Sequence, residues 1–315
     1  MTTLLDVGII GGGPAGLNAA LVLGRARKSV VVIDEGRPRN RVTGESHGFL
    51  TRDGIKPAEF RRIAKEQIQA YPTVRFVEDT AVTAAGEDGH FQITTARGET
   101  LHTKKLLIAA GMKDAPLDIR GLADVYGKSA FVCPYCDGWE LRDRPLVVIV
   151  PRDHVLHMAK MISGWTAQFT VCTHGQGEWT EGHRGELERR HVPVFDLPID
   201  YIESQDGAVR QVVLQDGTAV PCTGIFFAPK LVPGSDLTQM LGCDMTEGGA
   251  MVVDDLGKTN VPGIYGAGDA ASAKYQVIAA AAAGALAGMA INNELQEEAW
   301  NRREEGDVGQ ANGLK

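Results

Sequence analysis

The stretch LDVGIIGGGPAGLNAALVLGRARKSVVVIDE, residues 5–35, decides the fold. An apolar run, Leu5–Ile10, leads into GGGPAG at Gly11–Gly16, and an alanine- and leucine-rich segment then continues to about Arg27. Ser29–Ile33 is apolar again and precedes two acidic residues. Two buried strands separated by a glycine-rich turn and a helix are typical of the parallel strand–helix–strand unit of an α/β fold.

The glycine spacing in this stretch is G-x-G-x-x-G, which predicts a dinucleotide-binding turn. Gly11 allows the tight turn, Gly13 lets a pyrophosphate approach the backbone, and Gly16 lets helix and strand pack closely. The N-terminus of the helix stabilises the phosphate charge. Asp34, which follows the last glycine by 18 positions, or Glu35 is expected to accept a hydrogen bond from the adenosine ribose.

A second motif, CPYCDG at Cys133–Gly138, predicts redox chemistry. Two thiols with two residues between them can close into a small disulfide, and their thiolate form reacts in thiol–disulfide exchange. Asp137 directly follows the second thiol and can relay the proton that each exchange step moves. We expect Cys133, Cys136 and Asp137 to be the catalytic residues.

The cysteine pair has two other interpretations. A zinc site usually needs two such pairs. The remaining cysteines stand singly in the sequence, so we predict no metal site; they are Cys172, Cys222 and Cys243. A structural disulfide would suit the proline and the Asp-Gly of the motif, but a redox cofactor in the same chain weakens that interpretation.

The composition limits both the class of protein and its compartment. The 315 residues suffice for about two domains, and 43% hydrophobic and 23% charged residues are ordinary for a globular protein. The net charge of −8 argues against a surface for nucleic acid or anionic membranes. We expect a cytoplasmic protein, because a basic leader is missing, the apolar run Val277–Ile291 looks too short to span a bilayer, and few cysteines are present.

A second strand–helix–strand pattern lies after the cysteine motif. Leu146–Val150 and Phe169–Thr173 are predicted strands and Val155–Ile162 is a predicted helix, so a second dinucleotide site is expected at the first loop. That loop, VPRDHV at Val150–Val155, has no glycine at the three expected positions, and its proline lacks a backbone donor for phosphate. THGQGE at 173–178 has a glutamate where a 2′-phosphate needs arginines. These residues predict a lost nicotinamide site, and the alternative is NADPH bound by an unrecognised loop.

With these motifs the chain resembles the low-molecular-weight thioredoxin reductase family. The similarity runs, in family order, through GGGPAG, IAAG (Ile108–Gly111), CPYCDG and GIYGAGDAA (Gly263–Ala271). The resemblance implies an α/β protein of two Rossmann-like three-layer domains that assembles as a homodimer. An FAD-binding domain would comprise residues 1–114 and 246–315, and an inserted domain, 115–245, would carry the cysteine pair and a degenerate nucleotide site.

The resemblance also implies how FAD is held. Gly268 and Asp269 would hold the ribityl and pyrophosphate groups, and Gln276-Val277 would meet the isoalloxazine at a helix start, which stabilises negative charge on the reduced ring. His47 either lies over a flavin edge or is an ordinary surface-loop histidine. The candidate FAD-binding residues are Gly11, Gly13, Pro14, Ala15, Gly16, Asp34, Glu35, Asn40, His47, Gly111, Gly268, Asp269, Gln276 and Val277.

The motif positions imply roles for the cysteines, but not the direction of electron flow. Cys136 would face the flavin and Cys133 would exchange with substrate. The family's NADPH reductases carry GxGxxA and an HRR-like run in the inserted domain, and both are absent here. The chain is similar instead to dithiol oxidases that close disulfides in small natural products and reduce oxygen, and to reductases fed by ferredoxin or a flavin carrier. Several such oxidases have histidine after the pair, whereas Asp137 is reductase-like.

We therefore predict an FAD-dependent thiol–disulfide oxidoreductase that works without NADPH, with a dithiol oxidase ranked first. The alternatives are a thioredoxin-type disulfide reductase fed by ferredoxin, another flavin carrier or NADPH, and a flavin-bearing redox switch. The substrate is expected to be a small dithiol or disulfide, or a thioredoxin-like protein. Neither a nucleic acid nor a membrane is an expected partner.

Overall fold

A computed structural model describes residues 3–115 and 117–312, without the side chains of residues 303–312. Its contacts divide the chain into two compact units. Unit 1 contains the described residues of 1–39, 58–113 and 231–315, and unit 2 contains those of 40–57 and 114–230. The chain passes between the units along β7 (Met112–Ala115) and β16 (Lys230–Pro233), which pair with each other.

Unit 1 is built on the strand–helix–strand stretch near the N-terminus. β1 (Leu4–Ile10) pairs in parallel with β2 (Val30–Ile33) and with β6 (Thr100–Ile108), and α1 (Pro14–Arg25) connects the first two strands. The sheet has the order β3-β2-β1-β6-β5-β4, and β17 pairs with β6. The other elements of unit 1 are α2 (Pro57–Gln69), β3 (Val74–Val77), β4 (Ala81–Glu87), β5 (His90–Thr95), α7 (Leu237–Met240), β17 (Ile264–Gly266), η3 (Gly268–Ala270) and α8 (Val277–Asn312).

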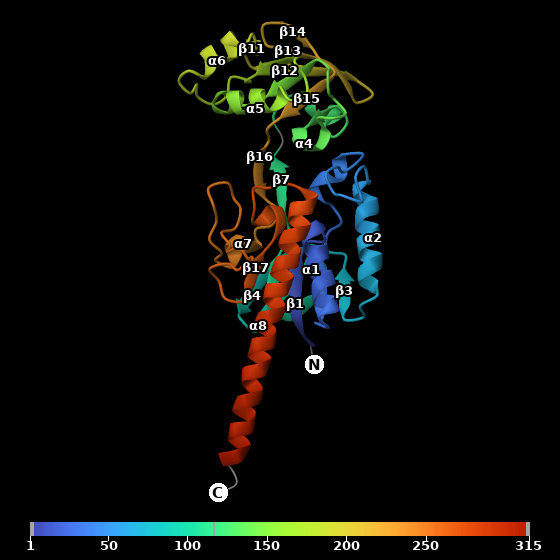
Figure 1. The fold of residues 1–315 in the computed structure, drawn as a ribbon, viewed down its shortest axis with the longest axis vertical. Coiled ribbons are helices and arrows are strands. Elements are labelled where there is room, and N and C mark those ends of the chain that lie inside the picture. Colours follow the sequence, from blue (N-terminus) through green and yellow to red (C-terminus); the bar gives the residue numbers. More distant parts are fainter. Residues whose placement is uncertain (1–2, 116, 313–315) are drawn as a thin grey trace. The chain divides into compact units, whose positions relative to one another are not determined.

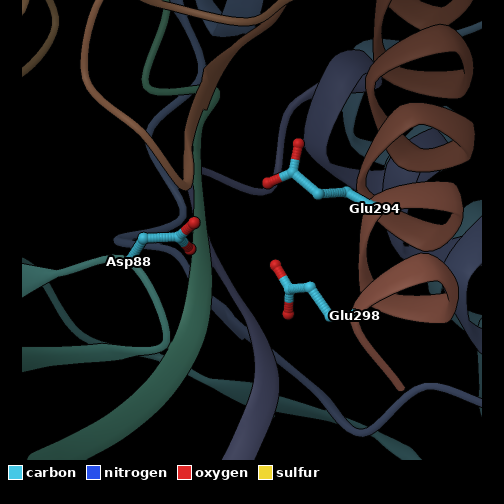
Figure 2. Close-up of side chains that lie close together, drawn as sticks. All are labelled: Asp88, Glu294 and Glu298. Atoms are coloured by element: carbon cyan, nitrogen blue, oxygen red, sulfur yellow. The ribbon is translucent and has the colours of Figure 1, made fainter. Parts of the chain in front are cut away.

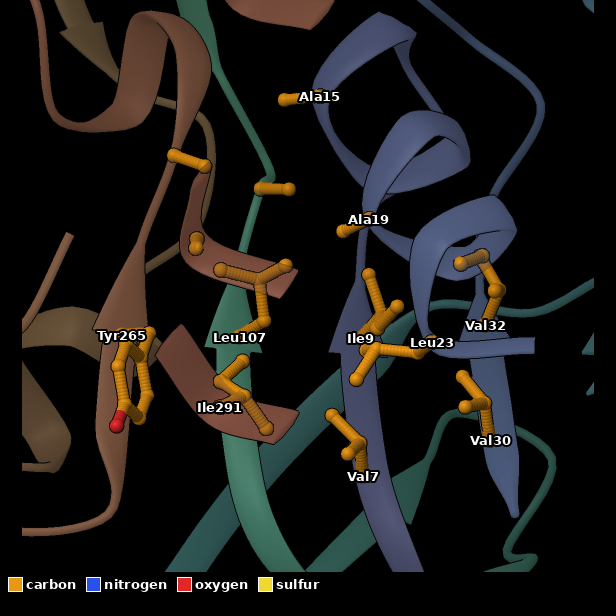
Figure 3. Close-up of a cluster of buried hydrophobic side chains, with 14 of the residues drawn as sticks. Val7, Ile9, Ala15, Ala19, Leu23, Val30, Val32, Leu107, Tyr265 and Ile291 are labelled. Atoms are coloured by element: carbon orange, nitrogen blue, oxygen red, sulfur yellow. The ribbon is translucent and has the colours of Figure 1, made fainter. Parts of the chain in front are cut away.

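The core of unit 1 lies between this sheet and the two helices α1 and α8. Figure 3 shows Val7 and Ile9 of β1 next to Leu23 of α1, with Ile291 of α8 beside them. α8 lies alongside α1 in Figure 1, and its Gly284 touches the α1 backbone so closely that an added side chain would collide with the carbonyl group there. Small residues therefore set how closely the two helices pack.

The expectation that Val277–Ile291 is too short to span a bilayer is wrong on length. α8 continues to Asn312, and by length and composition its part Val277–Arg302 could cross a membrane. In the structure, however, Ala287 and Ile291 of this helix are fully buried in the core of unit 1. The face of α8 that carries Ala287 and Ile291 is thus covered by the protein itself, whereas Ile278, Leu286 and Met289 of the same helix are exposed.

Unit 2 repeats the parallel strand–helix–strand arrangement on a smaller scale. Its sheet has the order β11-β10-β9-β15-β8, and a separate antiparallel sheet has the order β12-β13-β14. Apolar side chains of β9, β10 and β15 are buried on both faces of the sheet. The elements are η1 (Arg39–Val42), α3 (Leu122–Val125), β8 (Ala130–Phe131), α4 (Pro134–Asp137), β9 (Leu146–Ile149), η2 (Arg152–His154), α5 (Val155–Ile162), β10 (Phe169–Cys172), α6 (His183–Arg189), β11 (Val194–Phe195), β12 (Ile199–Gln205), β13 (Ala208–Leu214), β14 (Ala219–Pro221) and β15 (Gly224–Phe227).

The boundaries of the units differ from those of the expected domains. The first lies at 113/114, close to the expected 114/115, but the second lies at 230/231 instead of 245/246. Leu237 and Cys243 explain this difference, because both are buried in the core of unit 1. Residues 40–57 group with unit 2, where the carbonyl of Val42 lies so close to Gly127 that a side chain there would collide with it.

Candidate active site

The predicted cysteine pair is closed as a disulfide in unit 2. Cys133 and Cys136 are bonded to each other, with their Cα atoms 5.3 Å apart. Pro134 begins the single turn α4, where proline suits the first helical position, and the amide of Cys136 donates to the carbonyl of Cys133 at 3.0 Å. The local turn therefore brings the two sulfur atoms together without any distant partner.

Trp165 packs against this turn, a role that the sequence did not reveal. An added Cβ on Gly138 would lie 2.9 Å from the Trp165 indole, so glycine is needed for the turn to rest on the ring. Tyr135, inside the motif, meets the same ring edge to face at 5.4 Å between centroids. Trp165 is a single aromatic residue in a loop, and nothing in its sequence context points to the motif.

Asp137 is placed to exchange protons near neutral pH. Burial raises the pKa of Asp137 to about 7, the carboxylate of Glu140 adds to this rise, and His47 opposes it. A carboxyl group that is half-ionised near neutral pH can both donate and accept a proton. The arrangement therefore suits the proton transfers of thiol–disulfide exchange.

The glycine turn of unit 1 has the shape of a phosphate cradle. Gly11 has φ +106°, which favours glycine, and a side chain on Gly16 would collide with the Gly11 carbonyl. A Cβ on Gly13, by contrast, would meet nothing within 4 Å. The start of α1 thus faces open space next to a backbone that a pyrophosphate can approach, as the sequence predicts. Pro14 and Ala15 form the first turn of this helix.

Arg61 of α2 is a further residue of this cradle that the sequence analysis missed. Its guanidinium donates to the carbonyls of Gly12 at 3.1 Å and Gly36 at 3.2 Å, and it forms an ion pair with Asp34. Asp34 also accepts from the amide of Gly12 at 3.0 Å. Arg61 therefore ties the glycine turn to the end of β2. An arginine on a polar helix gives no sequence signal for this role.

The other acidic candidates of unit 1 have ion-pair partners. Glu35 is bonded to Arg37 at 2.8 Å, on the surface. Asp269 lies 3.8 Å from Arg39, and the Arg39 guanidinium lies over the Tyr275 ring at 5.2 Å. Arg39 and Tyr275 were not predicted, although Arg39 stands in the charged segment after Glu35.

Gly111 and the start of α8 complete the predicted FAD residues of unit 1. A Cβ on Gly111 would meet nothing within 4 Å, which leaves room for a ligand there. α8 begins at Val277, directly after Gln276, and Gly268 belongs to the turn η3. Asn40 and His47, which are also candidates to bind this cofactor, group with unit 2.

The corresponding turn of unit 2 is occupied by its own side chains. The amide of Arg152 donates to the Gln176 carbonyl at 2.9 Å, and its guanidinium donates to the Gly177 carbonyl at 2.9 Å and to Asp196 at 2.8 Å. The backbone amide and the guanidinium of Arg152 are therefore both bonded within the protein. A bound phosphate would need such groups as its own partners.

Asp196 connects several loops at this edge of the sheet through hydrogen bonds. It accepts hydrogen bonds from the hydroxyl of Thr173 and, at 3.3 Å, from the indole of Trp179. Burial opposes ionisation of Asp196, but the hydrogen bonds from Arg152, Thr173 and Trp179 hold its pKa below its ordinary value. His174, in the segment that would meet a 2′-phosphate, accepts from the Ile199 amide at 2.8 Å. This network fixes the turn in a form without a phosphate cradle.

Three carboxylates of unit 1 gather in a way that could suggest a metal. Figure 2 shows Asp88, Glu294 and Glu298 pointing toward one another. The buried ammonium group of Lys105 lies 2.7 Å from Asp88 and 2.6 Å from Glu294, and it also pairs with Glu298. Burial alone would lower the pKa of Lys105, but its carboxylate partners raise it above the ordinary value. The cluster is therefore an ion-pair network that ties β6 to α8.

Comparison with known proteins identifies the family. The sequence model described as "Pyridine nucleotide-disulphide oxidoreductase" matches residues 5–150 and 196–285. The chain is also similar to thioredoxin reductase tcpT of Claviceps purpurea, with 30% identity over 309 residues that cover 93% of this chain and 95% of that protein. The chain belongs to the pyridine nucleotide-disulphide oxidoreductase family.

Solved structures of similar proteins agree with the fold described above. HlmI is 31% identical, with a TM-score of 0.93 and 99% of both chains covered. An oxidoreductase from Agrobacterium tumefaciens is 36% identical, with a TM-score of 0.87 over 93% of this chain and 99% of that one. The predicted fold class and the resemblance to thioredoxin reductases are thus confirmed.

Family membership also gives the cofactor and the class of reaction. The chain is an FAD-dependent oxidoreductase that acts on a dithiol or disulfide, as predicted. The open glycine cradle of unit 1 fits FAD, and Gly11, Gly13 and Gly16 would lie at its pyrophosphate.

Proposed function

We propose that this enzyme exchanges electrons between a dithiol or disulfide substrate and its cysteine pair without a nicotinamide cofactor, and that it acts as a dithiol oxidase with oxygen as the final acceptor. The single observation that carries this proposal is that Arg152 and Asp196 fill the turn at which a nicotinamide phosphate would bind. The family match also leaves out residues 151–195, which include most of this turn.

The exchange step can be written with the substrate and the chain's own residues so that bonds, electrons and protons balance. A substrate thiolate attacks the sulfur of Cys133, the Cys133–Cys136 bond breaks, and Cys136 leaves as a thiolate. The second substrate thiolate then attacks the mixed disulfide, which releases the oxidised substrate and leaves both cysteines reduced. The two protons of the substrate end on the cysteine pair, moved by Asp137. Bound FAD would take two electrons and two protons from the pair and pass them to oxygen, giving hydrogen peroxide.

The decisive experiment compares flavin reduction by NADPH, NADH and dithiothreitol, mixed with the holoenzyme without oxygen. We expect the dithiol to bleach the flavin and both nicotinamides to leave it oxidised over the same time. Admission of air should then return the flavin colour, with about one hydrogen peroxide per dithiol oxidised. Rapid bleaching by NADPH would instead make the protein an NADPH-dependent disulfide reductase.

Cys136→Ser tests whether the pair carries the electrons. We expect this variant to retain FAD and to lose dithiol turnover by at least about a hundredfold, because the disulfide cannot form. Cys243→Ala, which removes a buried thiol of unit 1, is the matched control and should keep full turnover. Turnover retained by Cys136→Ser, measured as hydrogen peroxide formation, would reject the role of the pair.

A disulfide reductase is the second candidate, because an acid follows the pair as in reductases and the relative tcpT is named a thioredoxin reductase. Its electrons would come from ferredoxin or another flavin carrier. Reduced ferredoxin should then bleach the flavin without oxygen, and the enzyme should reduce the disulfide of a thioredoxin-like protein. A lack of turnover with every dithiol and disulfide would favour a flavin-bearing redox switch.

We extend the proposal to assembly and location, both of which follow from the family resemblance and the few cysteines. The protein would be a cytoplasmic homodimer. Light scattering of the purified holoenzyme should give twice the chain mass of 33.7 kDa. Fractionation of cells that produce the protein should recover it with the cytoplasmic enzymes.

A further inference from the structure

The imidazole of His47 lies among carboxylates of unit 2. Its Nδ1 is 3.4 Å from Asp53, and its Nε2 is 3.7 Å from Glu45 and 3.9 Å from Glu140. The histidine side chain is 20% exposed, whereas its three partners are between 46% and 68% exposed, so the ring is the inner member of the group. The imidazole therefore faces carboxylate groups on both of its nitrogen atoms.

The loop that carries His47 is held in place by its own hydrogen bonds. The Ser46 amide donates to the Ile55 carbonyl at 2.8 Å, and the Gly54 amide returns to Ser46 at 3.0 Å. Asp53 also accepts from the amide of Gly48 at 2.8 Å. The position of His47 is therefore fixed by the loop, and no ligand is needed to order it.

Glu140 connects this histidine to the redox motif. It stands three residues after Asp137, beyond the turn that holds the cysteines. The two charged neighbours that act on Asp137 are Glu140, which favours the protonated carboxyl, and His47, which favours the carboxylate. The charged groups that face His47 in turn are Glu45, Asp53 and Glu140.

We propose that His47 and Glu140 are positioning residues for Asp137, and that their opposed charges set the pH at which Asp137 delivers its proton to the cysteine pair. This inference rests on the role of Asp137 in the proposed function. Reduction of the disulfide to two thiols consumes two electrons and two protons. If the protonation state of Asp137 changes over the same pH range, the reduction potential of the cysteine pair depends on pH in a different way. His47 acts here through carboxylates, a role that differs from both of the sequence-based alternatives, a flavin contact and an ordinary surface-loop histidine.

The test measures the pH dependence of the Cys133–Cys136 couple in the holoenzyme. Protein is equilibrated with dithiothreitol redox buffers from pH 5.5 to 9, and the reduced fraction is counted by thiol alkylation and mass spectrometry. His47→Gln should move the inflection near neutral pH upward by about 0.5–1 unit, because Glu140 then acts unopposed, and Glu140→Gln should move it downward by a similar amount.

A permanently charged residue at position 47 distinguishes an electrostatic role of His47 from a role in the structure of its loop. His47→Arg keeps a positive charge beside Glu140, so its inflection should stay at or below that of the wild type, although the ring is lost. His157→Gln, an exposed histidine of α5, is the matched control and should leave the curve unchanged. Circular dichroism and FAD content confirm that each variant folds; Glu140 is exposed enough for its variant to fold even if His47→Gln does not.

The outcomes separate this inference from the proposed function. Asp137→Asn should remove the inflection altogether. If it does so while His47→Gln and Glu140→Gln leave the wild-type curve in place, or shift it in the same direction, the role of His47 is overturned and that of Asp137 stands. An inflection that persists in Asp137→Asn overturns both.

Discussion

The turn after β1 in unit 1 and the turn after β9 in unit 2 occupy equivalent places in two strand–helix–strand arrangements, yet one is open and the other is filled. After β1, Gly13 leaves space in which a Cβ would touch nothing within 4 Å. After β9, Arg152 is bonded to Gly177 and Asp196. The two sheets are alike, so the difference between the two turns lies in the partners that their hydrogen-bond donors bind.

The two units also place their ion-paired cations differently. In unit 1, Lys105 pairs with Val7 across the sheet, four residues before Gly11, and its charge is neutralised by carboxylates of Asp88 and α8. In unit 2, Arg152 lies inside the turn. In unit 1 the Lys105 network therefore lies outside the cradle and the Arg61–Asp34 pair borders it, so the space at Gly13 stays open, whereas in unit 2 Arg152 fills the turn itself.

The largest expected effect is on unit 1 and comes from Lys105→Met. Removing this ammonium group leaves three carboxylates close together with only the Lys258 pair to Glu294 recorded among the described residues, so the free energy of unfolding should fall by about 3–5 kcal/mol. Burial opposes ionisation of Glu294, but its partners hold the pKa of Glu294 at about 2, which shows how strongly it depends on them. Urea denaturation at pH 7 measures the change; a loss below about 1 kcal/mol would mean that the network is dispensable.

Gly13→Glu should break the open cradle without breaking the fold. The new side chain enters free space and places a negative charge where the pyrophosphate lies, so FAD affinity should fall at least about a hundredfold. Flavin absorbance per protein after gel filtration gives the result. Asp153→Glu in η2 is the matched change in unit 2 and should leave the flavin content intact, and an equal loss in both variants would contradict the comparison.

The smallest effect is expected from Arg152→Met in the filled turn. The arginine is one-quarter exposed, so the loss of its bonds to Asp196 should lower the free energy of unfolding at pH 7 by only about 1 kcal/mol. Because the pKa of folded Asp196 is lowered, its stabilisation is present above the unfolded pKa of about 4 and is lost as pH falls through the folded value. Urea curves at pH 7 and pH 3.5 should therefore show a smaller difference between variant and wild type at the lower pH; an equal difference would remove Asp196 as the cause.

Sequence alone was accurate where the structure is local. The expected strands and helix around Gly11–Gly16 agree with β1, α1 and β2 to within about two residues at each end. The disulfide of Cys133 and Cys136 forms inside one turn. Sequence was less accurate for the second domain boundary and for the length of α8, because burial of Leu237 and contacts along a helix depend on distant residues.

The sequence by itself determined that a nucleotide cradle and a redox pair exist, because glycine conformation and the spacing within a turn are properties of neighbouring residues. It also determined that the second cradle lacks its glycines. Only the tertiary structure decided which side chains fill that cradle and which ones surround Asp137. Arg152 and Asp196 are 44 positions apart, and Lys105 and Glu294 are 189 positions apart, so packing rather than local pattern selects these partners.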